Sequence, residues 1–266
     1  MVGLRKRLEV LSVNELFPDM MDKPDGSMAG AGLAYMLAVF LILPFFMLIL
    51  VVDAYQSDEA QFWLEFGFHV LSAVVCFLVF RSHFEDSLIT AKTDKKRFLI
   101  GTAIGLVLSV GVVMAAFNLL MILPQETAQF QAGMFFSIPM SEKNFVTYPL
   151  YMLHTHPVLA TVCLTVLAPV SISCLYYGSC FAQVCYRKPW LAYPVTALLI
   201  ALPRIVNCMT FRWDGGFEML QYLYQLPLHF VACYSYQKTD SILAPVIVHG
   251  VVNLVGCVAM LVLTIV

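Results

Sequence analysis

Charged residues are scarce in this sequence. They make up 12% of its 266 residues, whereas about a quarter of the residues of an average soluble domain are charged. Hydrophobic residues make up 61%, so too little polar material is left to cover a water-soluble fold. The formal net charge of -2 lacks the basic surplus of a nucleic-acid-binding protein, and we expect no nucleic-acid partner. A polytopic membrane protein is the class that remains.

Two further absences narrow the class. The eight cysteines include no CxxC pair and lie within or at the end of apolar stretches, so they indicate packing residues and not a disulfide framework or a zinc knuckle. The first thirty residues contain no short apolar core followed by a small-residue cleavage site. We therefore expect the first membrane span to be retained.

Long uncharged runs predict an all-α fold, a transmembrane helical bundle of about seven spans. The runs cover residues 29–52, 62–80, 98–123, 157–186, 190–209, 217–236 and 241–266. The fourth run is long, and we expect it to be tilted or broken near Pro169. Residues 125–149 are too interrupted for a span, which favours a re-entrant or interfacial segment.

Basic residues predict the orientation, because Lys and Arg accumulate in cytoplasmic loops. With the N-terminus in the cytoplasm, twelve of them lie inside and only Lys143 and Arg212 lie outside. We thus expect a cytoplasmic amphipathic tail over residues 1–28, N-terminal membrane helices over 29–148 and a membrane core over 149–266. The predicted setting is the plasma membrane, with its lipids as partners.

Polar side chains at bilayer depth are candidates for function, because they are costly there. They are Glu65, His69, Arg204, Asn207, His229, His249 and Asn253. His249 and Asn253 share a helix face at i, i+4, which fits either a catalytic or metal-binding pair or an interhelical hydrogen-bonding pair. Arg204 either caps carbonyls freed around Pro203 or holds an anionic group.

Three residues on different predicted spans are expected to lie at similar depths in the membrane. At about 1.5 Å per residue, Arg204 and Ser173 each lie roughly 21 Å from the cytoplasmic ends of their spans, and His249 lies roughly 14 Å from Asp240. The three residues are therefore predicted to line one cavity open to the cytoplasm.

A second group lies at the outer ends of the predicted spans. Glu65 and His69 share one helix face, and His154 and His156 precede the fourth span. These four side chains fit two interpretations. One is an outward-facing metal site, and the other is a Glu-His hydrogen bond beside an interfacial turn.

The run "YSYQKTDSILAPVIVHGVVN" resembles the last motif of the CAAX protease and bacteriocin-processing family of intramembrane proteases. The matching positions are Thr239, Ser241, Ala244, Pro245, His249 and Asn253. An earlier stretch resembles the first and second motif helices through Ala168, Pro169 and Gly178. The resemblance covers about residues 149–266 and implies the helical scaffold of an intramembrane endopeptidase.

The sequence differs from that family at the positions for which the resemblance implies a catalytic role. Ile172 and Ser173 stand where the family has two glutamates, and Tyr177 stands where it has an arginine. Ile200 and Arg204 replace the phenylalanine and histidine of the second motif. Of the catalytic set that the resemblance implies, His249 and Asn253 remain. Ser173 cannot act as a general base at neutral pH, and the fixed charge of Arg204 disfavours a divalent ion, so we expect neither metal nor cofactor.

Three hypotheses of function follow. The first is a pseudoprotease that binds a membrane protein or peptide partner through a cavity lined by Arg204, Ser173 and Tyr177. The second is an active intramembrane endopeptidase with a relocated acid, such as Glu65, Glu218 or Asp240. The third is a small-molecule or lipid transporter, which prolines in three consecutive spans would suit, although the two halves show no repeat.

Overall fold

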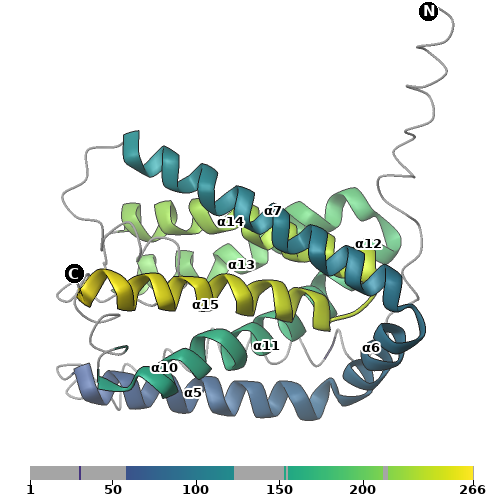
Figure 1. Cartoon of the computed structure of the whole chain (residues 1–266), viewed down its shortest axis with the longest axis horizontal. Coiled ribbons are helices and arrows are strands. Elements are labelled where there is room, and N and C mark those ends of the chain that lie inside the picture. The colour runs from purple at the N-terminus through teal and green to yellow at the C-terminus, as the bar shows by residue number, and fades with distance from the viewer. Residues whose placement is uncertain (1–29, 31–57, 123–152, 154, 212–214, 266) are drawn as a thin grey trace, which may run out of the picture.

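The computed structural model describes residues 30, 58–122, 153, 155–211 and 215–265. Every element within these ranges is a helix, which confirms the all-α prediction (Figure 1). The elements are α5 (Asp58–Val79), α6 (Arg81–Thr93), α7 (Lys95–Ile122), α10 (Pro157–Val162), η3 (Cys163–Leu167), α11 (Ala168–Ile172), η4 (Ser173–Phe181), α12 (Ala182–Arg187), α13 (Pro189–Phe211), α14 (Gly215–Thr239) and α15 (Leu243–Ile265), where η denotes a π-helix.

The predicted apolar runs can be compared with these helices one by one. The six runs from residue 62 onward coincide with α5, α7, the stretch from α10 to α12, α13, α14 and α15. Apart from residue 30, the first run lies outside the described residues, as do the tail over residues 1–28 and the segment over 125–149. Two helical stretches in the described part, Lys95–Ala115 and Pro157–Arg187, are long and apolar enough to cross a membrane. A third qualifies if the bent pair α5 and α6 is counted as one span. The count of seven spans and the cytoplasmic N-terminus stay predictions.

The helix from Pro157 to Arg187 passes through Pro169 without a break. It widens into π-helical turns on both sides of the short α11, which carries Pro169 near its start. A proline cannot donate the intrahelical hydrogen bond, and its ring crowds the carbonyl one turn earlier. The wider turns of η3 accommodate that ring, so the chain absorbs the proline by widening and not by breaking.

The bundle is organised around α14, which packs against α7, α13 and α15 (Figure 1). On the other side of α15 lie η3 and α11, and α5 packs against these two. Large buried side chains fill the centre, among them Phe80, Tyr177, Phe181, Tyr236 and Ile242. Leu99, Val107 and Val110 of α7 are well over half exposed. A continuous exposed apolar face of this kind is what a lipid-facing helix presents.

Residues with small or no side chains bring the helices close together. A Cβ on Gly105 of α7 would lie 2.9 Å from Val248 Cγ2 of α15 and 3.1 Å from Ser235 Cβ of α14. Helices in lipid associate through such close approach, since hydrocarbon gives them no hydrophobic reason to pair.

The segment from α6 to the start of α7 is joined to the turn between α14 and α15. The backbone N–H of Ile242 donates to the buried Ser87 hydroxyl at 3.0 Å, and His83 Nε2 is hydrogen-bonded to the Tyr236 hydroxyl at 2.9 Å. Arg97 Nε donates to the carbonyl of Lys238 at 2.7 Å. Helices from both sides of the predicted boundary at residue 149 therefore pack in one bundle, while the boundary itself lies outside the described residues.

Replacing Ser87 with alanine is expected to lower the free energy of unfolding by about 1 kcal/mol, because the buried N–H at the start of α15 loses its acceptor. The change is measured as a lower melting temperature of the purified protein in detergent. Ser82→Ala is the matched control, since Ser82 lies exposed on the same helix. Equal melting temperatures for the two variants would show that Ser87 does not cap α15.

Candidate functional site

A buried polar cluster starts on η4. Ser173 and Tyr177 are four residues apart on this π-helix, and both side chains are fully buried. π-Helical turns are rare and occur often at functional sites. Here they carry two of the residues that the sequence predicts to line a cavity.

Tyr177 contacts a histidine on another helix. Its hydroxyl is hydrogen-bonded to His229 Nδ1 of α14 at 2.7 Å, and both side chains are buried. A buried imidazole and a buried phenol each need such a partner, because an unpaired polar group in the interior costs free energy. The pair therefore fixes His229 against η4.

His229 also contacts the histidine of the last predicted motif. The rings of His229 and His249 lie 5.9 Å apart between centroids and meet edge to face at 88°. Tyr177, His229 and His249 thus form a contiguous set drawn from η4, α14 and α15. We call these three residues and the buried Ser173, which lies four residues before Tyr177 on η4, the polar cluster.

Two atoms of the polar cluster have no hydrogen-bond partner among the residues that the structure describes. They are Ser173 Oγ and His249 Nδ1, and both are shielded from solvent. Each is a hydrogen-bonding group that a bound molecule with a matching donor or acceptor would satisfy.

Asn253 has a different partner from the one that its spacing suggests. Its Nδ2 donates to the carbonyl of Leu164 on η3 at 2.8 Å. This bond holds α15 against η3, where Gly250 also lies close to the Thr165 carbonyl. An interhelical hydrogen bond was one of the two interpretations for this residue, but its partner is a backbone carbonyl of η3.

The comparisons with known proteins bear on this same part of the chain. Residues 154–255 match the family model described as "Type II CAAX prenyl endopeptidase Rce1-like". This segment, less than half of the chain, is similar to the Rce1-like CAAX protease family. No curated protein and no solved structure matches the chain. The match contains the entire polar cluster and, together with the apolar helices, identifies a membrane protein.

The described part of the Rce1-like segment shows no metal-binding group. Among the described residues, no three His, Cys, Asp or Glu side chains come together in a way that could hold a metal ion. No hydrogen bond or ion pair joins His249 to a carboxylate in the described part. The described polar groups of the cluster around His249 are therefore hydroxyl and imidazole groups.

Arg204 lies on α13, and its side chain is outside the described residues. The same holds for Asn207 on α13 and for Glu218 on α14. The predicted meeting of Arg204 with Ser173 and His249 in one cavity therefore stays a prediction.

His229 has no role in the predicted site, although the structure places it at the centre of the polar cluster. Its presence at bilayer depth was the only signal. No spacing links it to Tyr177 or His249, because the three residues lie on separate helices. Only the packing of α14 against η4 and α15 reveals the contact.

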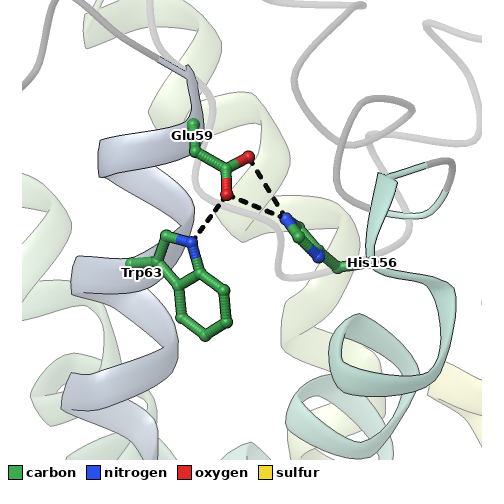
Figure 2. Close-up of polar contacts among 3 residues, drawn as sticks. All are labelled: Glu59, Trp63 and His156. Atoms are coloured by element: carbon green, nitrogen blue, oxygen red, sulfur yellow. Dashed lines mark hydrogen bonds and ion pairs between the residues drawn. The ribbon is translucent and has the colours of Figure 1, made fainter.

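A second polar contact lies near the start of the Rce1-like segment, and Figure 2 shows it. His156 Nε2 lies 3.1 and 3.2 Å from the two carboxylate oxygens of Glu59, and Trp63 Nε1 donates to that carboxylate at 2.6 Å. The His156 ring stacks on Phe62 with centroids 4.5 Å apart. The contact joins α5 to the start of α10.

Glu59 was not among the residues predicted for this region. The sequence pointed to Glu65, His69, His154 and His156, and of these the side chain of Glu65 and all of His154 lie outside the described residues. The Glu-His hydrogen bond considered from the sequence would join Glu65 to His69, whereas the described bond joins Glu59 to His156. Glu59 lies six residues before Glu65 on α5, at the position that meets the start of α10.

Proposed function

We propose that this protein is a pseudoprotease of the CAAX protease type, which binds a prenylated peptide or a membrane-protein partner without cleaving it. The binding site is an intramembrane cavity open to the cytoplasm, lined by Arg204, Ser173 and Tyr177 beside His249. The matching family model is described as a type II CAAX prenyl endopeptidase, which supports a prenylated peptide as the ligand. The residues Ile172, Ser173 and Arg204 at the motif positions support binding without cleavage. We further propose the plasma membrane as its location.

One observation carries the proposal, which is the chemical identity of the polar cluster. Its described members are a serine hydroxyl, a phenol and two imidazoles. Cleavage of a peptide bond by water requires a group that takes a proton from the water, and a carboxylate is what the resemblance implies at the positions of Ile172 and Ser173. A serine hydroxyl is not a base at neutral pH. The described cluster can therefore bind a peptide by hydrogen bonding. It has no described carboxylate that would activate water, as a protease of this scaffold requires.

The same groups support binding. Ser173 Oγ and His249 Nδ1 are buried and have no partner in the described part of the chain. A peptide offers amide N–H and carbonyl groups that match them, and its carboxyl terminus would pair with the guanidinium of Arg204. The apolar prenyl chain suits a site among membrane helices.

Replacing His249 with alanine is expected to weaken binding of a fluorescent prenylated CAAX peptide by about tenfold, because one hydrogen bond to a buried group is lost. Fluorescence anisotropy of the protein in nanodiscs measures the affinity. His83→Ala is the control, since His83 contacts Tyr236 and lies outside the polar cluster. Equal affinities of wild type and His249→Ala would contradict the proposed site, and His249→Gln repeats the test if alanine prevents folding.

The other two hypotheses predict different results in the same system. An active endopeptidase with a relocated acid shortens the peptide, and a transporter moves a solute across the bilayer of reconstituted vesicles. Binding without either product distinguishes the pseudoprotease from both.

A further inference from the structure

Three exposed lysines surround the turn between α6 and α7. Lys92 lies in the last turn of α6, and Lys95 and Lys96 begin α7. None of the three forms an ion pair with the described part of the chain, in contrast to the exposed pair Arg81 and Glu85 on α6. The lysine charges are thus available to a partner outside the protein.

The position of Lys95 and Lys96 is unfavourable for the helix itself. The N-terminal end of a helix carries partial positive charge, so cations in the first turn are repelled by it. No acidic residue lies in the first turn of α7, although the Asp94 carboxylate just before it accepts the backbone N–H of Arg97 at 3.2 Å. Helix stability does not explain two adjacent lysines there, whereas attraction to an external anion does.

The neighbouring helices indicate the depth of these lysines in the membrane. The stretch of α7 that is long enough to span the bilayer begins at Lys95, and Leu99 and Ile100 are exposed one turn later. Lys95 and Lys96 therefore lie at the level of the lipid headgroups.

Helix α6 has the features of a helix that lies along the membrane surface. The chain bends by 74° between the apolar part of α5 and α6. Four charged side chains on α6 make it unsuited to the hydrocarbon core, while Leu88 and Ile89 are 47% and 57% exposed. The charged residues are two acids and two bases, and charged residues beside exposed apolar ones suit a helix at the interface.

We infer that Leu88, Ile89, Lys92, Lys95 and Lys96 form a surface that binds the headgroups of anionic membrane lipids. We call it the α6–α7 surface. The apolar pair enters the acyl boundary, and the lysines contact phosphate or carboxylate groups at the headgroup level. Because each basic residue near an anionic leaflet strengthens association, three lysines give a marked preference for anionic over zwitterionic lipid. The inference does not depend on the proposed function, since it concerns a different part of the molecule.

The test uses the full-length protein in detergent, exposed to equal amounts of phosphatidylglycerol and phosphatidylcholine. Native mass spectrometry measures the ratio of the two lipids that stay bound. We expect the wild type to prefer phosphatidylglycerol. In the triple variant Lys92→Gln, Lys95→Gln, Lys96→Gln, the ratio of bound phosphatidylglycerol to bound phosphatidylcholine is expected to fall at least tenfold. The double variant Arg187→Gln, Lys188→Gln removes two exposed charges at the end of the other spanning stretch and serves as the control for a general loss of positive charge at the membrane surface.

Several outcomes would overturn the inference. They are an unchanged lipid ratio in the triple variant, an equal loss in the control variant, and displacement of the lipid by inorganic phosphate but not by sodium chloride of the same ionic strength, which would show a site for free phosphate. A second measurement needs no variant. Raising the salt concentration is expected to reduce the wild-type preference through screening, and a preference that is independent of salt would contradict a role for the lysine charges.

Discussion

Replacing Gly250 with valine is expected to destabilise the bundle by more than about 3 kcal/mol, a large part of the stability of a typical domain. A Cβ at this position would lie 2.5 Å from the Thr165 carbonyl oxygen and 3.6 Å from its carbon. These are backbone atoms of η3, so no side-chain rotation relieves the clash. The substitution forces α15 and η3 apart and breaks the bond from Asn253 to Leu164 on the same face.

The melting temperature in detergent measures this effect, and the chain provides a matched control. Gly111 lies in α7, and a Cβ there meets no atom of the described residues within 4 Å. Gly111→Val is therefore expected to leave the melting temperature near that of the wild type. If Gly250→Val and Gly111→Val have the same melting temperature, α15 and η3 do not approach each other as closely as described.

The second large effect is expected from replacing Tyr177 with phenylalanine. The change removes the hydroxyl that is bound to the buried His229 Nδ1, which costs about 1–3 kcal/mol and removes one restraint on the imidazole that contacts His249. If the polar cluster is the binding site, the affinity for the prenylated peptide falls by about tenfold or more.

Tyr193→Phe separates binding from stability. Tyr193 donates its hydroxyl hydrogen to Gln237 Oε1 at 2.7 Å, so this variant also loses a hydrogen bond between helices. Its affinity for the peptide is expected to stay at the wild-type value even where its melting temperature falls. A parallel loss of affinity in both variants would mean that Tyr177 acts through general stability and not through the cluster.

Much of the helical fold could be predicted from the sequence, because apolar runs of membrane length allow few alternatives to a helix. The runs from residue 62 onward coincide with helices within a few residues at each end. The bend after α5 and the widened turns around Pro169 were not predictable in this way. Both depend on packing partners, namely the Ser87 and His83 contacts of α6 and the approach of α15 to η3.

The candidate site was predictable only in part. Motif spacing pointed to His249, Ser173 and Tyr177, since aligned positions need no knowledge of packing. It also grouped His249 with Asn253, whereas the Asn253 amide binds the Leu164 carbonyl. His229 and Glu59 have partners far away in sequence, Tyr177 and His156, so no local pattern connects them.

The most direct test of the central claim is the mass of a prenylated CAAX peptide after incubation with the purified protein in nanodiscs, measured together with the fraction bound. We predict that the peptide binds and that its mass is unchanged, because the described polar cluster offers no carboxylate to activate water. A shortened peptide, formed by the wild type and absent with His249→Ala, would show an active endopeptidase and contradict the pseudoprotease.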